Sequence, residues 1–252
     1  MGKIKQDVPS ELRGFAGLFD EMTYKHGDMG RVFSDFVDFW VGGMMVAGDK
    51  PLANRLEAHY GAEYGYFNKM VAEILMAYCS KIREEGDWYD GLGIFYETIA
   101  SRYKSSYLGQ FFTPAPVCDL MVEITSPAGK QTVNDSCCGS GRMLLAAKVV
   151  NPAGRFYGAD VDPVCAKMTA INMGMHACEG EVSCINSITM EWRFGYHVNP
   201  YFGFKGILPV PHLEPIHDFE YSIFYPQKGI CGIDYPIEEK VNKDKHGQLS
   251  LF

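Results

Sequence analysis

Residues 135–141 read Asp-Ser-Cys-Cys-Gly-Ser-Gly, between the short apolar run at 132–134 and a helical pattern at 142–150. This order predicts a strand, a glycine turn and a helix. Glycine lets the backbone turn sharply and lets a ligand lie directly against it. The first N–H groups of the helix lack partners within the helix and suit a ligand carboxylate. The stretch therefore predicts either a ligand-binding loop or a plain turn.

Strands and helices alternate around this turn. Residues 154–160 and 181–185 have the pattern of strands, and residues 164–176 that of a helix between them. Such alternation is typical of a parallel sheet with crossover helices. We therefore expect an α/β, Rossmann-like fold with a mainly parallel sheet.

The flanking regions differ from this central part. Before about residue 102 the apolar spacing is helical, most clearly at 32–43, 70–82 and 88–100. After about residue 204 prolines become frequent and no helix or strand rhythm remains. We therefore expect an N-terminal helical domain at 1–105, a central domain at 106–215 and an irregular tail at 216–252.

A second acidic motif, Tyr-Gly-Ala-Asp-Val-Asp-Pro, occupies residues 157–163. Asp160 lies about 20 residues after the glycine loop, which suits a hydrogen bond to a ribose diol. Asp162 followed by Pro163 is a good start for a helix. Spacing alone leaves open a nicotinamide nucleotide or S-adenosylmethionine. A G-x-G-x-x-G loop for pyrophosphate is absent, so an amino-acid moiety fits better, with Asp135 accepting from its ammonium group.

Gly-Gln-Phe-Phe-Thr-Pro at 109–114, the glycine loop at 135–141 and Gly-Ala-Asp-Val-Asp-Pro at 158–163 stand in a fixed order. Together they resemble the N6-adenine DNA methylase family, in particular the modification subunits of type I restriction–modification systems. The resemblance implies a class I S-adenosylmethionine-dependent methyltransferase that acts on DNA with a specificity subunit. It also implies the residues that bind S-adenosylmethionine: Phe112, Thr113, Asp135, Cys138, Gly139, Gly141, Asp160 and Asn186.

The family's catalytic motif is Asn-Pro-Pro followed by Phe or Tyr, whose Asn and Pro oxygens accept from the adenine amino group. Its ring stacks on a flipped base. The best match here is Asn199-Pro200-Tyr201-Phe202, which we expect to be catalytic, although Tyr201 replaces one proline. A turn with surface aromatic residues is the alternative interpretation. Residues 192–195 do not have a clear strand pattern before it.

Composition limits the other classes of function. The formal net charge of -8 argues against a freestanding nucleic-acid binder, so partners are expected to supply most phosphate contacts. No C-x-x-C pair indicates a metal site. The longest apolar stretch is too short to span a bilayer and the start does not read as a signal peptide. We therefore expect a cytoplasmic protein that does not enter the membrane.

Three hypotheses about function remain open at this stage. The first is an adenine-N6-specific DNA methyltransferase that relies on a partner for sequence recognition. The second is a catalytically inactive, S-adenosylmethionine-binding accessory or decoy subunit, favoured by the altered motif at 199–202 and the short C-terminal part. The third is a methyltransferase for protein or RNA, which the ordered motifs disfavour.

Residues 248–252 read Gln-Leu-Ser-Leu-Phe. They resemble the peptide by which bacterial polymerases and repair proteins dock on the sliding clamp. Leu249, Leu251 and Phe252 could enter an apolar groove while Gln248 fixes the register. The alternative is an apolar tail that folds back on its own domain.

Overall fold

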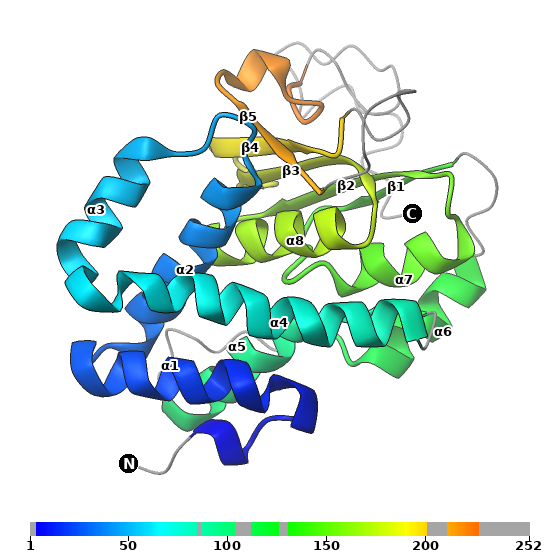
Figure 1. Ribbon diagram of the computed structural model, residues 1–252. Coiled ribbons are helices and arrows are strands. Elements are labelled where there is room, and N and C mark those ends of the chain that lie inside the picture. The colour runs from blue at the N-terminus through cyan, green and yellow to red at the C-terminus, as the bar shows by residue number, and fades with distance from the viewer. Residues whose placement is uncertain (1–3, 85–86, 104–111, 126–130, 201–210, 227–252) are drawn as a thin grey trace. The chain divides into compact units, whose positions relative to one another are not determined.

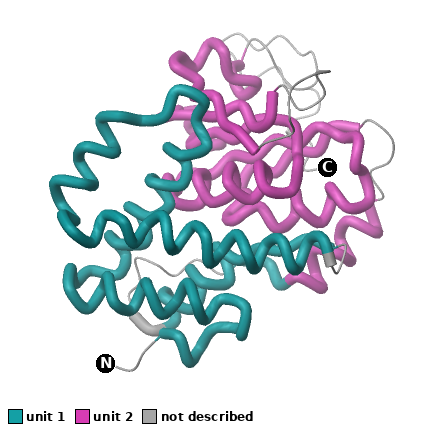
Figure 2. The backbone as a smooth tube through the Cα atoms, in the orientation of Figure 1, with its two compact units in different colours: residues 1–114 teal, residues 115–252 magenta. Residues whose placement is uncertain are grey.

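The computed structural model describes residues 4–84, 87–103, 112–125, 131–200 and 211–226. The chain divides into two compact units, residues 1–114 and residues 115–252 (Figure 2).

The first unit is helical, as the apolar spacing predicts. Phe95 of α5 lies at the centre of its core, with ring centroids 4.6 Å from Phe15 and 4.9 Å from Phe19. Both contacts are edge-to-face, an arrangement that aromatic pairs prefer. The elements of this unit are η1 (Ile4–Gln6), η2 (Ser10–Leu12), α1 (Arg13–His26), α2 (Met29–Met44), α3 (Lys50–Tyr60), η3 (Gly61–Tyr64), α4 (Gly65–Glu84) and α5 (Gly91–Tyr103).

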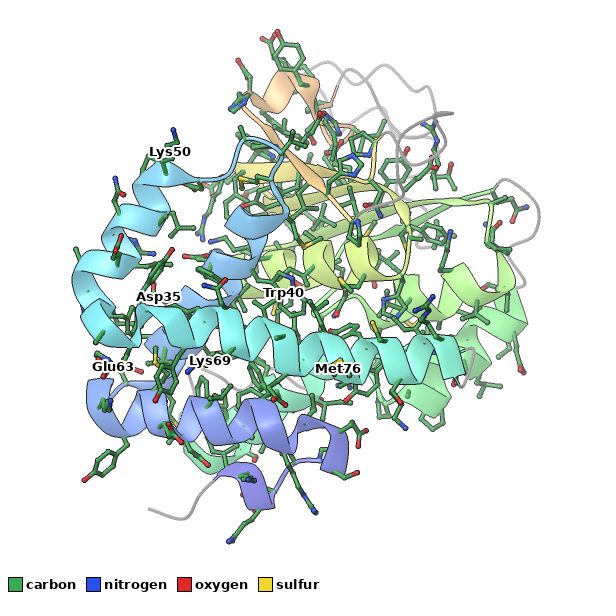
Figure 3. All side chains as sticks on the ribbon, in the orientation of Figure 1. Asp35, Trp40, Lys50, Glu63, Lys69 and Met76 are labelled. Atoms are coloured by element: carbon green, nitrogen blue, oxygen red, sulfur yellow. The ribbon has the colours of Figure 1, made fainter. Side chains whose placement is uncertain are left out.

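A buried carboxylate joins α2 to α3. Asp35 of α2, labelled in Figure 3, is 5% exposed. It accepts hydrogen bonds of 2.9 Å from both the Tyr60 hydroxyl and the Arg55 guanidinium. Burial, followed by the bond to Asp35, raises the pKa of the Tyr60 hydroxyl well above its usual range. The apolar stripes of this unit thus form a core, and the buried Asp35 carboxylate is paired.

The second unit has the predicted α/β fold (Figure 1). Its elements are α6 (Ala115–Thr125), β1 (Thr132–Asp135), α7 (Arg142–Val150), β2 (Arg155–Asp160), α8 (Pro163–Met175), β3 (Glu179–Ile185), β4 (Trp192–Val198), β5 (Leu213–Ile216) and η4 (Phe219–Tyr221). The strand order is β1-β2-β3-β4-β5. β1, β2 and β3 are parallel, while β4 is antiparallel to both of its neighbours.

Two strands lie where the sequence pattern predicted none. β4 covers 192–195, which we expected not to be a strand, and β5 lies within the proline-rich part after residue 204. In β4 the large apolar side chains Trp192, Phe194, Tyr196 and Val198 alternate with Arg193, Gly195 and His197. This period of two is the strand signal, which Gly195 and the charged residues obscure. β5 is an edge strand among the described residues, where Pro215 is tolerated.

The two faces of the sheet are covered differently. α7 and α8 lie on one face (Figure 1). On the other face, Phe224 of the segment after β5 packs with Ala159 and Ile185. Residues 217–226, which include η4, therefore cover part of the face opposite α7 and α8.

α8 begins as its sequence predicts. Asp162 is the N-cap, and its carboxylate accepts from the backbone N–H groups of Val164 and Cys165 at 2.8 and 3.0 Å. Pro163 occupies the first turn, where its missing N–H is not needed. Within the described ranges, no helix is long and apolar enough to cross a bilayer.

Candidate functional site

The glycine loop joins β1 to α7, as predicted. Gly139 and Gly141 adopt positive φ angles of 56° and 91°, which side chains with a Cβ rarely tolerate. A Cβ at Gly141 would also lie 3.1 Å from Cγ2 of Thr169. The turn is closed by the Gly141 N–H, which donates to the Cys138 carbonyl at 2.7 Å. Glycine is therefore required here by both the backbone conformation and the neighbouring helix.

Asp160 ties this loop to the end of β2. One carboxylate oxygen accepts from the Gly139 N–H at 2.8 Å, and the other accepts from the Asp162 N–H at 2.9 Å. Each carboxylate oxygen has a second lone pair, so Asp160 retains acceptor capacity for a diol. The structure thus brings Asp160, Gly139 and Gly141 together, as the two motifs predicted.

Two side chains of α8 bind the backbone of the glycine loop. The Thr169 hydroxyl donates to the Gly139 carbonyl at 2.9 Å, and the Asn172 amide donates to the Ser140 carbonyl at 2.7 Å. Both residues are fully buried. Sequence reasoning missed them, although their spacing of three places them on one face of the helix. Polar residues in an otherwise apolar helix were the available signal.

The loop after β3 is tied to the same edge. The Ser187 hydroxyl donates to the Ser136 carbonyl at 2.8 Å. The side-chain oxygen of Asn186 accepts from the N–H groups of Ile188 and Thr189 at 3.0 and 3.2 Å. Asn186 therefore shapes its own turn, and its Nδ2 group is left as the donor toward any ligand. Loops after three parallel strands thus meet at one edge, the usual place for a ligand in such sheets.

Asp135 and Cys138 line the loop on the side of the sheet. Asp135, which is 8% exposed, accepts from the Cys137 N–H at 3.1 Å. The Cys138 N–H donates to the Ala159 carbonyl at 2.9 Å, and its buried thiol accepts from Thr169. Cys138 thus has its N–H and its thiol engaged within the protein. Asp135 keeps carboxylate lone pairs for a ligand.

Burial dominates the electrostatics of the two carboxylates. It raises the pKa of Asp135, which the Cys137 N–H lowers and the charge of Asp160 raises further. It also raises the pKa of Asp160, against hydrogen bonds from the N–H groups of Asp162 and Gly139. Two poorly solvated acidic groups beside one loop favour a cationic or hydroxyl-rich ligand, because such a ligand supplies the donors that water no longer provides.

Asn199 lies far from this edge. It follows β4, which runs antiparallel to β3, with Val198 opposite Gly180 near the start of β3. Asp160 pairs with Cys184, which in turn lies opposite Phe194. Five residues of strand separate Phe194 from Asn199, roughly 17 Å along β4. The structure therefore does not bring Asn199 to the glycine loop.

The side chain of Asn199 is used within the fold. It is fully buried, with a positive φ of 50°. Its amide donates to the carbonyls of Gly174 and Cys178 at 3.2 and 2.9 Å, and its oxygen accepts from the His212 N–H at 3.0 Å. Both amide hydrogens and one lone pair of the oxygen bond within the fold, and the side chain is buried away from solvent, so this geometry does not support the catalytic role expected for Asn199.

The remaining predicted residues are placed as follows. Pro200 follows Asn199 at the same end of the sheet, while Tyr201, Phe202 and residues 248–252 lie outside the described residues. Phe112 belongs to the first unit, where its N–H donates to Glu97 at 3.2 Å and its ring stacks on Tyr96. Thr113 belongs to that unit too, and is exposed. In the part of the chain that the structure describes, no cluster of three or more metal-ligating side chains is found.

The part of the chain that contains the glycine loop is similar to a known protein family. Residues 87–193 match the model of the N-6 DNA Methylase family. The match confirms the resemblance drawn from the three motifs, and with it the methyltransferase class of the α/β unit. It ends before Asn199, so it does not cover the motif expected to be catalytic.

Individual relatives are type I restriction enzyme subunits. The methylase subunit of the MjaIX type I restriction enzyme from Methanocaldococcus jannaschii is 25% identical over 155 residues, which are 56% of this chain and 26% of that protein. The chain thus spans about a quarter of that relative's length.

Two solved structures are also similar. A modification subunit of a putative type I restriction enzyme from Vibrio vulnificus YJ016 gives a TM-score of 0.31 at 19% identity, over 45% of this chain and 25% of that one. A type I restriction–modification methyltransferase subunit from Streptococcus thermophilus gives 0.32 at 17% identity, over 69% and 56%.

Proposed function

We propose that this chain binds S-adenosylmethionine and takes part in methylation of adenine N6 in DNA, with sequence recognition supplied by a specificity subunit. One observation carries the cofactor assignment: Asp160 at the end of β2 is hydrogen-bonded to Gly139 of the glycine loop after β1. The ribose of the cofactor needs an acidic acceptor, and its amino-acid part needs a backbone without side chains close to that acceptor. Asp160 and Gly139 supply the two, side by side.

Each part of the cofactor has a candidate partner in this unit. Asp160 accepts from the ribose hydroxyls, and Asp135 accepts from the ammonium group. The ligand carboxylate meets the N-terminal turn of α7. Nδ2 of Asn186 donates to a ring nitrogen of the adenine, beside Val161 and Ile188, whose apolar side chains are 52% and 93% exposed. These last two residues were not predicted from the sequence.

The protein's task in the transfer is alignment. When bound, the cofactor supplies an activated methyl group, so the chain needs no metal or covalent nucleophile. The group that orients the target amino group is then one other than Asn199, whose buried side chain is hydrogen-bonded within the fold. The same observation favours a second candidate function, an S-adenosylmethionine-binding accessory subunit without activity of its own.

Calorimetry with S-adenosylhomocysteine tests the cofactor assignment. Wild type should bind, and Asp160→Ala should weaken binding roughly tenfold to a hundredfold, the value of a charge-assisted hydrogen bond. Transfer of labelled methyl groups to unmethylated DNA, with and without a candidate specificity subunit, then separates the enzyme from the accessory protein. If the wild-type chain does not bind S-adenosylhomocysteine at millimolar concentration, both the methyltransferase and the accessory function are refuted.

We further propose that residues 248–252 dock on a bacterial sliding clamp. A clamp that encircles DNA would raise the local concentration of substrate around a protein of net charge -8. In a fluorescence titration with purified clamp, wild type should bind weakly and a chain lacking residues 248–252 should not. Equal binding by both chains contradicts this proposal.

A further inference from the structure

The sheet face opposite α7 and α8 contains a pocket of about 270 Å³. A Cβ at Gly158 would face Thr169 and Leu144, so the neighbouring Tyr157 points to the opposite face. Tyr157 pairs with Glu181, which lies opposite His197 on β4. These three side chains form the floor of the pocket, together with Arg155 and Glu179 at the starts of their strands.

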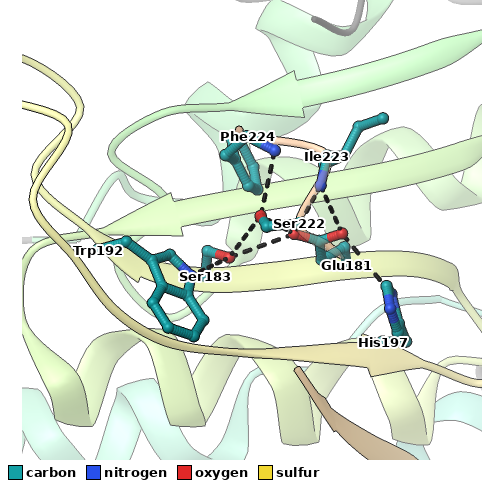
Figure 4. A network of polar contacts seen from close by, with 7 residues as sticks. All are labelled: Glu181, Ser183, Trp192, His197, Ser222, Ile223 and Phe224. Atoms are coloured by element: carbon teal, nitrogen blue, oxygen red, sulfur yellow. Dashed lines mark hydrogen bonds and ion pairs between the residues drawn. The ribbon is translucent and has the colours of Figure 1, made fainter. Parts of the chain in front are cut away.

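Polar side chains on adjacent inner strands are unusual, because such strands are normally apolar on both faces. Here Glu181 is 2% exposed and organises the pocket (Figure 4). Its carboxylate accepts from the Ser222 hydroxyl, from the Ser183 hydroxyl at 3.2 Å, and from the Ile223 N–H at 3.0 and 3.2 Å. These bonds fix the 217–226 segment on the sheet, so that Tyr221 and Ile223 form the other wall.

Glu181 also orients His197. Nδ1 of the imidazole lies 3.6 Å from the carboxylate, and Figure 4 marks this contact. Because Nδ1 faces Glu181, Nε2 lies on the side of the ring away from that carboxylate. The pocket wall and the direction of the imidazole therefore depend on the same buried carboxylate.

Several polar groups that line this pocket have no partner among the residues described. They are the Glu179 carboxylate, the Tyr157 hydroxyl, Nε2 of His197 and the Arg155 guanidinium. One of them, the Glu179 carboxylate, is an acceptor. Arg155 is exposed and suits a phosphate at the rim. Tyr157 from the sheet and Tyr221 from η4 present aromatic side chains to a planar ligand.

We infer that this pocket binds a single nucleobase that carries an exocyclic amino group. The amino group donates to Glu179, the ring contacts the tyrosines, and Arg155 meets the attached phosphate. The volume lies just below the range of pockets for drug-sized ligands, which fits one base. The base comes from a free nucleotide or from an unstacked position in nucleic acid, because both present the same edges.

This site is separate from the glycine loop. Tyr157 precedes Asp160 by three residues, roughly 10 Å along the strand, and it points to the other face. Binding here therefore does not depend on the proposed cofactor function. A saturating concentration of S-adenosylhomocysteine keeps the cofactor site out of the measurement.

The test is calorimetry on the full chain with that ligand present. Deoxyadenosine and deoxycytidine monophosphates should bind, and thymidine monophosphate, which lacks an amino group, should bind roughly tenfold more weakly or worse. Glu179→Gln should narrow this ratio, because an amide can donate to the thymine carbonyl as well as accept. Glu191→Gln, at the other end of the sheet, is the matched control and should leave the ratio unchanged.

A single-stranded and a duplex oligonucleotide distinguish the two sources of the base. Tighter binding of the single strand than of the mononucleotide, lost in Arg155→Ala, assigns the site to nucleic acid. Equal affinities assign it to free nucleotides. No binding of either monophosphate at millimolar concentration, or equal binding of all three by wild type and Glu179→Gln, overturns the inference.

Discussion

At the scale of single residues, the site combines carboxylates with little solvation and glycines with positive φ angles. Asp135 and Asp160 are both held in conditions that oppose their charged forms, while backbone N–H groups partly compensate. Such groups are costly in the free protein and useful once a ligand supplies donors. The two carboxylates are therefore expected to lower the stability of the ligand-free protein and to strengthen ligand binding.

Asp135→Asn tests this expectation. Because burial raises the pKa of Asp135, the stability this group contributes is present below its unfolded pKa, near 4, and is lost as the pH rises through the higher folded value. At pH 7 the ligand-free variant should melt at the same or a higher temperature than wild type. Below pH 4 any gain should vanish.

Cofactor binding should change in the opposite direction, with affinity for S-adenosylhomocysteine falling at least about tenfold because the ammonium group loses its ionic partner. Thermal melts between about pH 3 and pH 8, with calorimetry at pH 7, measure both effects. A variant that melts lower and binds normally would show that Asp135 is only structural.

Asn199, unlike Asp135, is expected to act in folding and not in ligand binding. Asn199→Ala leaves two buried carbonyls and one N–H without their partner, at a cost of about 1–3 kcal/mol. The positive φ of 50° adds about 1 kcal/mol for alanine. Urea unfolding should show this loss of stability, with cofactor affinity of the folded protein unchanged.

Asn186→Ala, in the turn after β3, is the contrasting variant, since it should weaken cofactor binding more than folding. If Asn199→Ala instead unfolds like wild type and abolishes only methyl transfer, the catalytic role expected from the sequence is right.

At the scale of elements, the sequence predicts what local rules determine. The strand, glycine turn and helix at 132–150 follow from the run Thr132–Asp135 and the two glycines, and α7 occupies the expected residues. Asp162 and Pro163 predict the start of α8 for the same reason, since cap and first turn depend on adjacent residues.

What the sequence did not provide depends on contacts between distant residues. The direction of β4 decides that Asn199 lies away from the loop, and direction follows from pairing with β3, not from the pattern of residues 192–198. Thr169 and Asn172 likewise become site residues only because α8 packs beneath the loop. The polar pocket likewise forms only because the register of β2, β3 and β4 aligns Tyr157, Glu181 and His197, which the sequence pattern does not reveal.

The pairing of β2 with β3 gives a prediction at this scale. A Cβ at Gly180 would lie 1.7 Å from the Phe156 carbonyl oxygen, so Gly180→Ala must separate the two strands. We expect a loss of about 1–3 kcal/mol or more, as for other overpacked sites. Gly43→Ala is the matched control, because open space surrounds that position in α2. Alanine there should raise the free energy of unfolding by about 0.5–1 kcal/mol.

Chemical denaturation of both variants measures these changes. Wild-type stability in Gly180→Ala would mean that the register between β2 and β3 is wrong.

The whole molecule consists of two compact units in one chain. Six fully buried phenylalanines of the first unit form a continuous set of ring contacts: Phe15, Phe19, Phe33, Phe36, Phe67 and Phe95. A core assembled from one continuous segment of this length is sufficient for independent folding. The cofactor loop lies entirely in the other unit.

These observations predict that a fragment of residues 1–114 folds alone. It should show helical circular dichroism and one cooperative thermal transition, and it should not bind S-adenosylhomocysteine, because Gly139, Gly141 and Asp160 are absent. Phe95→Ala in the same fragment is the control. Removing the ring at the centre of the cluster should cost about 3–5 kcal/mol and abolish the transition. A fragment without a transition, or one that Phe95→Ala leaves unchanged, would mean that the helices require the α/β unit to fold.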